Sequence, residues 1–258
     1  MSIYNILSVQ ICPKLADKQY NLNKVKEFIE QHSDKKLDLV IMPEFFSTGI
    51  DDNVFKKLAE TEASSETIEF FSKLAKKYNT NILTGTIIEK DGDDLYNSTF
   101  FINRQGHVIG KYRKIHLFDY FGGNEGKLIT SGDEVVVVDS DMGKIGLSIC
   151  FDIRFPLLYN KLLKKGAQII TCSAAWSIDA LNEWELLNQT HALNNAAFFV
   201  SSSLCGKTCY EHSGNSMVVS PMGKILARAK TQDEALLAQI DIREVKELRN
   251  AFPIMNLE

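Results

Sequence analysis

Cys150, Glu44 and Lys114 each stand at the exit of an apolar segment that is typical of a β-strand. A cysteine nucleophile needs a base that takes its proton, and a carboxylate can do this. The tetrahedral oxyanion that forms next needs a fixed positive group or backbone N–H donors. These three residue types together supply the parts for acyl transfer without a histidine.

Cys150 lies between the buried strand expected at Ile145–Ile149 and a helical pattern that begins beyond Asp152. In this position the thiol faces the positive end of a helix dipole, and we expect its pKa to be lowered. The alternative is that Cys150 is a buried small hydrophobe, as most free cysteines are.

The other candidates have plainer interpretations as well. Glu44 could be a solvated loop carboxylate or a charge at a helix start, and Lys114 ends a polar cluster whose lysines usually face solvent. His116 could be a core histidine. A cysteine–histidine hydrolase, with His116 or His191 as its base, is a different class of enzyme that the sequence leaves open.

Three segments carry a family resemblance: MPEFF at Met42–Phe46, KYRKIHLF at Lys111–Phe118 and SICFDIRFP at Ser148–Pro156. They resemble the three signature segments of the nitrilase, or carbon–nitrogen hydrolase, superfamily. Their order and spacing match, and the resemblance covers nearly the whole chain.

The resemblance implies a Glu–Lys–Cys triad. By motif, Glu44 is the general base, Lys114 stabilises the oxyanion and transition state, and Cys150 is the nucleophile, while the backbone N–H of Phe151 joins the oxyanion hole. The implied reaction is acyl transfer through a cysteine thioester, with no metal and no organic cofactor.

The fold class expected is α/β. Alternating helices and strands, with several hairpins, indicate mixed sheets that have helices stacked outside them. The resemblance implies a four-layer α-β-β-α sandwich with two mixed β-sheets, whose subunits commonly pair. No linker, repeat or composition shift divides the chain, so we expect one domain over residues 1–258.

The hydrophobic pattern places the elements in order. We expect helices that begin at Asn21, after Ser64 or Ser65, and beyond Asp152, and a fourth over residues 180–195. Residues 118–133 read as a long loop. The expected strands are 3–11, 37–42, 81–88, 96–102, 107–112, 135–138, 144–149, 168–172, 197–201, 216–220, 225–229 and 236–240.

Glu125 is the only glutamate between Lys114 and Glu134. The family often carries a further carboxylate in the loop after the lysine, and the resemblance makes Glu125 the candidate for this accessory role. A solvated loop residue is the alternative.

Several neighbours of the motifs have two interpretations each. Asp152 and Arg154 could form an ion pair that braces the turn after Cys150, which we favour, or Arg154 could bind a substrate carboxylate. Trp176 and Phe45 could line the substrate pocket or pack in the core.

Composition excludes some classes of partner. The net charge is −4 with mixed signs, which argues against nucleic acid and anionic membranes. The sequence shows no signal-peptide pattern and no apolar run of membrane-spanning length. Five cysteines do not suggest a disulfide framework, so we expect a reducing cytoplasm. The resemblance implies a small-molecule amide as substrate and a homodimer or higher homo-oligomer.

Several other signals in the sequence are set aside. Cys205, Cys209 and His212 lie close in sequence, but they lack a fourth ligand and a usual zinc spacing, so no metal is expected. Cys12 and Cys172 read as packing residues. The glycines around Gly122–Gly126 lack the ending of a phosphate loop, and no dinucleotide fingerprint is present.

The function expected is that of an amidase. Trp176-Ser177, Trp184 and Asn194-Asn195-Ala196 most resemble the ω-amidase branch, which hydrolyses small dicarboxylic monoamides such as α-ketoglutaramate. A nitrilase, an N-carbamoyl-amine hydrolase and a deaminated-glutathione amidase remain alternatives with the same triad. A non-catalytic binding or scaffold protein of the same fold is a more distant one.

Overall fold

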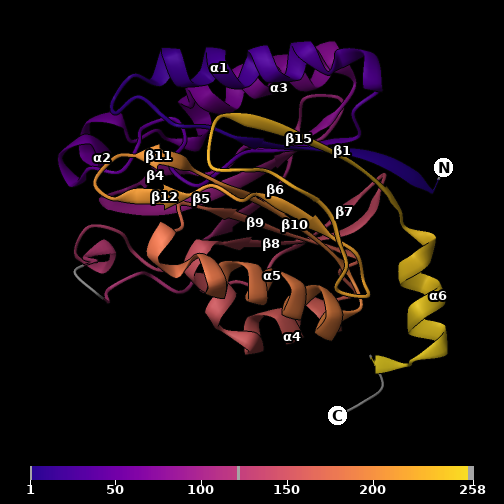
Figure 1. Cartoon of the computed structure of the whole chain (residues 1–258). Helices are drawn as coiled ribbons and strands as arrows, with labels where there is room; N and C mark the ends of the chain where they lie inside the picture. The colour runs from indigo at the N-terminus through magenta and orange to yellow at the C-terminus, as the bar shows by residue number, and fades with distance from the viewer. Residues whose placement is uncertain (1, 121–122, 255–258) are drawn as a thin grey trace.

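The computed structural model describes residues 2–120 and 123–254 of the chain. Two β-sheets lie face to face, and helices cover the outer face of each (Figure 1). This arrangement confirms the expected four-layer α-β-β-α sandwich with two mixed sheets. Residues 121 and 122, in the long loop expected at 118–133, lie outside the described part.

The first sheet is mixed and has seven strands: β1 (Ile3–Gln10), β2 (Leu39–Ile41), β3 (Asn81–Leu83), β4 (Ile87–Asp91), β5 (Asp94–Ile102), β6 (Val108–Arg113) and β15 (Glu234–Asp241). Their order is β15-β1-β2-β3-β5-β4, with β6 paired to β5. Parallel pairing joins β1, β2 and β3. Because β2 is covered on both faces, all its residues are apolar and buried.

The second sheet has six strands: β7 (Val137–Ser140), β8 (Gly143–Ile149), β9 (Ile169–Ala174), β10 (Phe198–Ser203), β13 (Met217–Val219) and β14 (Ile225–Arg228). Their order is β14-β13-β10-β9-β8-β7, and β8, β9 and β10 are parallel. Hydroxyls bridge the two sheets where β1 meets β10. Ser8 Oγ donates to the Ser201 carbonyl at 2.7 Å, and Ser202 Oγ donates to the Val9 carbonyl at 2.5 Å.

The helices form the outer layers: α1 (Lys18–Gln31) and α3 (Glu66–Tyr78) over the first sheet, α4 (Pro156–Lys164) and α5 (Leu181–Asn195) over the second, with α2 (Asp52–Leu58) and α6 (Arg243–Ala251) at the margins (Figure 1). Ser65 caps α3 by accepting from Ile68 N at 3.0 Å, as expected. The expected cap at Asn21 is wrong, because Asp17 caps α1. Asn21 is buried inside that helix and binds the backbone of Lys14 instead.

The strand expected over residues 81–88 is two strands, because the chain turns between β3 and β4. Gly85 has a φ of +67°, and a Cβ there would lie 2.3 Å from the Pro43 carbonyl oxygen. Thr86 Oγ1 then accepts from Phe45 N at 2.9 Å. This turn therefore supports the segment that carries Glu44.

The sequence pattern missed short elements. These are α2, a hairpin of β11 (Cys205–Lys207) and β12 (Glu211–Ser213), and single 3-10 turns at Ser33–Lys35, Glu62–Ser64, Glu125–Lys127, Cys150–Arg154 and Ile178–Ala180. Elements this short have too few residues to show a hydrophobic period.

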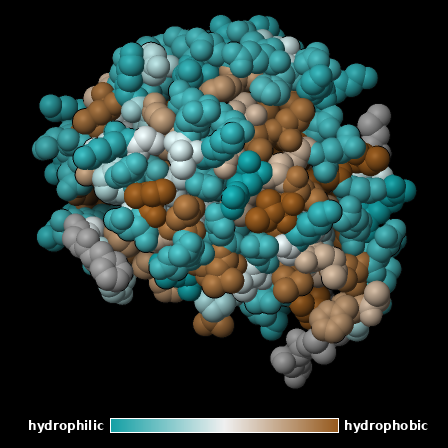
Figure 2. Space-filling view, in the orientation of Figure 1, coloured by the Kyte–Doolittle hydropathy of each residue, from teal (hydrophilic) through white to brown (hydrophobic). Residues whose placement is uncertain are grey.

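The surface in Figure 2 is mostly hydrophilic over α1 and α3, and hydrophobic residues lie among polar ones in the lower half, where α4 and α5 are found in Figure 1. Leu157 and Leu193, on these two helices, are 76% and 51% exposed. Of the helices in the described ranges, none combines the length and the apolar character needed to cross a bilayer.

Candidate active site

Glu44, Lys114 and Cys150 come together although they arise from two sheets. Glu44 and Lys114 follow β2 and β6 of the first sheet, and Cys150 follows β8 of the second. All three side chains are buried, at 1%, 2% and 8% exposure. The interpretations of Glu44 as a solvated loop carboxylate and of Lys114 as a solvent-facing lysine are therefore wrong.

The carboxylate of Glu44 is fixed by three donors. Its Oε1 accepts from Lys114 Nζ at 2.9 Å and from Asn97 Nδ2 at 2.8 Å. Its Oε2 accepts from the backbone N–H of Ala175 at 3.0 Å, in the segment that follows β9. Burial raises the pKa of Glu44, and the charge of Lys114 only partly offsets this. Glu44 is thus better suited to accept a proton than an exposed glutamate.

Glu125 also belongs to this cluster, and its contacts exclude the alternative of a solvated loop residue. Its Oε2 accepts from Lys114 Nζ at 2.7 Å and from Phe118 N at 2.8 Å. Burial disfavours the charge of Lys114, but Glu125, Glu44 and Cys150 outweigh burial and raise the Lys114 pKa well above its ordinary value. The ammonium is therefore held charged inside the protein.

Asn97 is a member of the site that the sequence analysis missed. Its Nδ2 donates to Glu44 Oε1 at 2.8 Å and to Glu125 Oε1 at 2.9 Å, and its backbone carbonyl accepts from Lys114 N at 2.9 Å. Asn97 is fully buried on β5, and its Oδ1 has no partner among the described residues. No signal in the sequence set Asn97 apart, because the serine and the threonine that follow it on the same strand are also polar and buried.

The thiol of Cys150 has a raised pKa, and the expected lowering is wrong. Burial contributes most, and the negative charge of Glu44 adds to it, while Lys114 acts in the opposite direction. These effects outweigh a helix dipole, which falls off within the first turn. The proton therefore stays on sulfur until a base removes it.

The backbone at Cys150 is in the left-handed region, with a φ of 47°. This conformation is costly for a residue with a Cβ, and it is typical of side chains that a sharp turn presents to a site. Phe45, beside the carboxylate, shares it with a φ of 52°. Two of the sharp turns in the chain therefore flank the cluster.

Phe151 lies in a group of aromatic rings. Its ring centroid is 5.2 Å from that of Phe118, 5.7 Å from Tyr120 and 5.4 Å from Phe155. The loop before Glu125 therefore packs on the turn that holds Cys150. The role of the Phe151 backbone N–H remains a prediction.

The expected brace between Asp152 and Arg154 is wrong. Asp152 Oδ1 accepts from His116 N at 3.0 Å and pairs with His116 Nδ1 at 2.8 Å, and Oδ2 accepts from Tyr112 at 2.7 Å and Ile149 N at 2.9 Å. A buried carboxylate takes the nearest donors on all sides, and these leave no place for Arg154.

Arg154 is exposed and lies over the Trp176 ring, with 5.4 Å between its guanidinium carbon and the ring centroid. It forms no ion pair with any residue that the structure describes. Trp176 is 5% exposed and packs on Trp184, and Phe45 stacks on Phe55 at 4.8 Å. Both aromatic residues belong to the packed interior beside the site.

Both histidines of the alternative hydrolase are engaged elsewhere. His116 pairs with Asp152 and stacks on Phe155 at 3.6 Å between ring centroids. His191 pairs with the Ile153 carbonyl at 2.7 Å, and burial lowers its pKa. The charged groups that dominate the surroundings of Cys150 are instead a carboxylate and an ammonium.

Tyr210 is a second neighbour that the sequence analysis missed. Its hydroxyl donates to the Ala175 carbonyl at 2.6 Å, and the Ala175 N–H holds Glu44. Burial, followed by the charges of Cys150 and Glu44, raises the Tyr210 pKa well above its ordinary value. The hairpin of β11 and β12 thus contacts the site.

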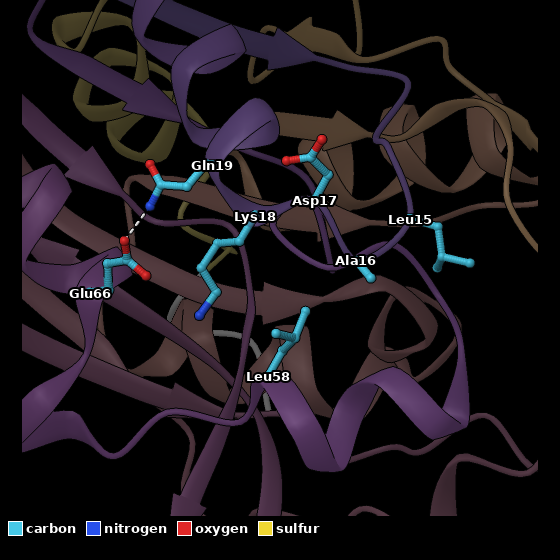
Figure 3. Close-up of a pocket in the computed structure, with 7 residues that line it drawn as sticks. All are labelled: Leu15, Ala16, Asp17, Lys18, Gln19, Leu58 and Glu66. Carbon is cyan, nitrogen blue, oxygen red and sulfur yellow. Dashed lines mark hydrogen bonds between the residues drawn. The ribbon is translucent and has the colours of Figure 1, made fainter.

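Two surface hollows do not coincide with this cluster. One, of about 350 Å³, is lined by Leu15, Ala16, Asp17, Lys18, Gln19, Leu58 and Glu66 (Figure 3). The other, of about 260 Å³, lies between α4 and α5. Figure 3 shows Gln19 hydrogen-bonded to Glu66 on one side of this hollow, and the apolar side chains of Leu15 and Leu58 among the others that line it. Neither hollow contains Glu44, Lys114 or Cys150.

The cluster has the parts of a nucleophilic acyl-transfer site. A protonated thiol lies beside a carboxylate with a raised pKa and beside an ammonium that two carboxylates keep charged. Such a carboxylate can take the thiol proton, and such an ammonium can stabilise an oxyanion.

Comparisons with known proteins agree with this chemistry. Residues 6–250 match the family model described as carbon-nitrogen hydrolase. The chain is 31% identical over 237 residues to the 2-oxoglutaramate amidase of Bacillus subtilis, which covers 92% of this chain and 90% of that protein. It is 32% identical over 261 residues to the omega-amidase NIT3 of Saccharomyces cerevisiae, at 95% and 90% coverage.

A solved structure of a nitrilase-superfamily protein has the same fold as this chain. The crystal structure of Saccharomyces cerevisiae Nit3, described as a member of branch 10 of the nitrilase superfamily, superposes with a TM-score of 0.90 at 30% identity. The superposition covers 98% of this chain and 95% of that chain.

Proposed function

The chain belongs to the carbon–nitrogen hydrolase family, and on this premise we propose that it is an amidase that hydrolyses small dicarboxylic monoamides. Relatives named 2-oxoglutaramate amidase and omega-amidase, similar over nine-tenths of the chain, support the amidase assignment. The proposed catalytic residues are Glu44 as general base, Lys114 as oxyanion stabiliser and Cys150 as nucleophile. The observation that carries the proposal is the contact of Lys114 Nζ with Glu44 and Glu125, beside the buried thiol.

Acylation is the first half of the proposed reaction. Glu44 takes the proton of Cys150, and the thiolate forms a C–S bond with the amide carbon. Lys114 and the backbone N–H of Phe151 stabilise the oxyanion. The C–N bond then breaks, Glu44 returns its proton to the leaving nitrogen, and ammonia departs from a thioester.

Hydrolysis of the thioester is the second half. Glu44 takes a proton from water, and the hydroxide adds to the acyl carbon. The C–S bond breaks, the thiolate regains its proton from Glu44, and the acid is released. Glu125 and Asn97 act as positioning residues, because both hold the groups that carry out these steps.

The substrate proposal rests on Arg154. This exposed guanidinium follows Cys150 within one 3-10 turn, and no carboxylate of the described residues pairs with it. A guanidinium matches a carboxylate with two parallel hydrogen bonds. We therefore assign Arg154 to the distal carboxylate of the substrate, of which α-ketoglutaramate is an example.

The test of the chemistry is the intact mass of the protein after brief mixing with amides, nitriles and carbamoyl compounds, with ammonia release followed in parallel. An acyl adduct that maps to Cys150, together with ammonia from a dicarboxylic monoamide, is expected. Cys172 is a matched control, because burial also raises its pKa, to about 12, and it should stay unmodified.

Other outcomes of this experiment refute parts of the proposal. Adducts formed only from nitriles or carbamoyl compounds would keep the triad and move the chain to a nitrilase or a carbamoyl-amine hydrolase. Turnover of no compound, with a Cys150 thiol inert to a mild alkylating agent, would favour a non-catalytic scaffold.

The test of the substrate class uses Arg154→Met. The KM for a dicarboxylic monoamide should rise by about tenfold or more, since a hydrogen bond to a charged group contributes about 1.5–3 kcal/mol. The KM for a neutral amide of the same length should stay unchanged. An equal change for both amides would refute the assignment of Arg154 to the substrate carboxylate.

The domain, assembly and location are also proposals. We propose one catalytic domain over residues 1–258, which the family match to residues 6–250 supports. A homodimer is supported by the exposed Leu157 and Leu193 on α4 and α5, and molar mass from light scattering tests it. A cytoplasmic location is consistent with the reduced thiol that the reaction requires, and cell fractionation tests it.

A further inference from the structure

Two cysteines and an aspartate from distant parts of the chain meet at a second place. Cys12 lies after the end of β1, Cys205 begins β11, and Asp233 directly precedes β15. Their two sulfur atoms and a carboxylate oxygen all lie within 4.8 Å of one another. Cys205 Sγ is 3.7 Å from Asp233 Oδ1. None of these residues is in the proposed catalytic cluster.

We propose that Cys12, Cys205 and Asp233 bind a borderline-soft divalent cation, of which Zn²⁺ is the best fit. Zn²⁺ binds sulfur at about 2.3 Å and carboxylate oxygen at about 2.0–2.2 Å in tetrahedral geometry, so its sulfur and oxygen ligands are about 3.5 Å apart. The separation of 3.7 Å between Cys205 Sγ and Asp233 Oδ1 is close to this value. A water molecule would supply the fourth ligand.

Backbone contacts hold the three ligands in place. Cys12 N donates to Asp233 Oδ1 at 2.6 Å, and Cys205 N donates to the Ile11 carbonyl at 3.0 Å. Gly206 has a φ of +67°, and a Cβ there would lie 2.8 Å from the sulfur of Cys12. Glycine at this position therefore leaves room for the sulfur of Cys12.

The charges also fit a divalent cation. Lys24 Nζ lies 3.3 Å from Asp233 Oδ2. Two thiolates and a carboxylate carry three negative charges, which the lysine and a divalent ion balance. Cys205 is buried, whereas Cys12 and Asp233 are partly exposed, so an ion can enter from one side.

The carboxylate favours a metal over a disulfide. A negative charge beside a thiol disfavours the thiolate, which is the form that attacks in thiol–disulfide exchange. A bound cation, by contrast, uses both thiolates and the carboxylate. The ligand set differs from the one that the sequence suggested and set aside: Cys209 and His212 are not in this cluster, and His212 binds Thr208.

The test is titration of the fully reduced chain with Zn²⁺ by calorimetry and with Co²⁺ by absorption. One equivalent is expected, and Co²⁺ should produce a sulfur-to-cobalt charge-transfer band with the visible bands of a four-coordinate ion. Cys205→Ser should abolish the band and weaken Zn²⁺ binding by more than about a hundredfold, since outer partners of a metal ligand alone account for about 10–100-fold. If Cys205→Ser fails to fold, Asp233→Asn replaces it as the test. Asp233 is nearer the surface, and its substitution should also weaken Zn²⁺ binding.

Two control variants test whether Zn²⁺ binding depends on Cys205 and not on other cysteines. Cys209→Ser removes an exposed cysteine from the same region and should leave binding unchanged. Cys150→Ala removes the proposed nucleophile and should also leave it unchanged. Binding that persists in Cys205→Ser, or that disappears in Cys150→Ala, would overturn the proposal. So would the absence of Zn²⁺ binding, including the case in which oxidation by a disulfide reagent links Cys12 to Cys205.

Discussion

Glu125→Gln removes one negative charge from the catalytic cluster and keeps the size of the side chain. Glu125 is among the charges that raise the pKa of Glu44, whereas the groups that dominate the surroundings of Cys150 are Glu44 and Lys114. Without Glu125, Glu44 becomes a weaker base while the thiol changes less. Transfer of the thiol proton therefore becomes less favourable.

The structure limits the size of this effect. Asn97 Nδ2 lies 2.8 Å from Glu44 Oε1 and 2.9 Å from Glu125 Oε1, so these oxygens are at most 5.7 Å apart (2.8 Å plus 2.9 Å). At an effective dielectric constant of about 20, two like charges at this separation repel by about 3 kcal/mol. Removing a repulsion of about 3 kcal/mol can lower kcat/KM by about a hundredfold, at about 1.4 kcal/mol for each factor of ten.

The assay is ammonia release from a dicarboxylic monoamide, measured as kcat/KM against pH. The acidic limb reports protonation of Glu44, and it should move to lower pH in Glu125→Gln, because the pKa of Glu44 falls. The control is Glu134→Gln, which removes an exposed carboxylate from the same loop and should change neither the rate nor the limb. A Glu125→Gln variant with an unchanged rate, or with its acidic limb at higher pH, would refute this reasoning.

Three further predictions concern other parts of the chain. Cys150→Ser should abolish turnover and leave the urea midpoint unchanged; near-normal ammonia release would rule out Cys150 as the nucleophile. Asn97→Leu should lower kcat/KM by at least about 10–100-fold, because its Nδ2 bonds to two carboxylates and the loss of one such bond alone costs about 1.5–3 kcal/mol. An unaffected rate would show that Asn97 does not position the cluster. Glu89→Gln should cost about 3–5 kcal/mol of stability at pH 7, because buried Glu89 pairs with Lys111 and Arg113. Burial raises the pKa of Glu89, but these pairs outweigh burial and lower the pKa to about 2. The stabilisation by Glu89 is therefore complete above pH 4.5 and is lost towards pH 2. Urea unfolding of both proteins should show that their difference in stability narrows over this range, and a constant difference would contradict the prediction.

The elements that carry the proposed triad could be predicted from the sequence, because their signals are local. The buried strands β2 and β8 appear as short apolar runs, and each ends directly before or near a reactive side chain. The start of α3 at Ser65 could also be predicted from the sequence, because a helix cap depends on neighbours within one turn. The cap at Asn21 failed because its amide serves a contact with Ser47, twenty-six positions away.

The environment of the site was decided by tertiary structure. Asn97 lies on β5 and Glu125 in a loop, and only the pairing of β5 with β6 and the packing of that loop bring them to Lys114. The direction of the Cys150 pKa shift was likewise set by burial and by Glu44, which comes from the other sheet.

The sequence by itself determined which residue types stand at which strand ends, because local patterns encode strands, turns and caps. Only the folded chain decided that Cys12 and Cys205 lie beside Asp233, and that Asp152 binds His116 and not Arg154. The physical reason is that hydrogen bonds and charge interactions act over a few ångströms in space, and the sheets bring together groups that are far apart in the sequence.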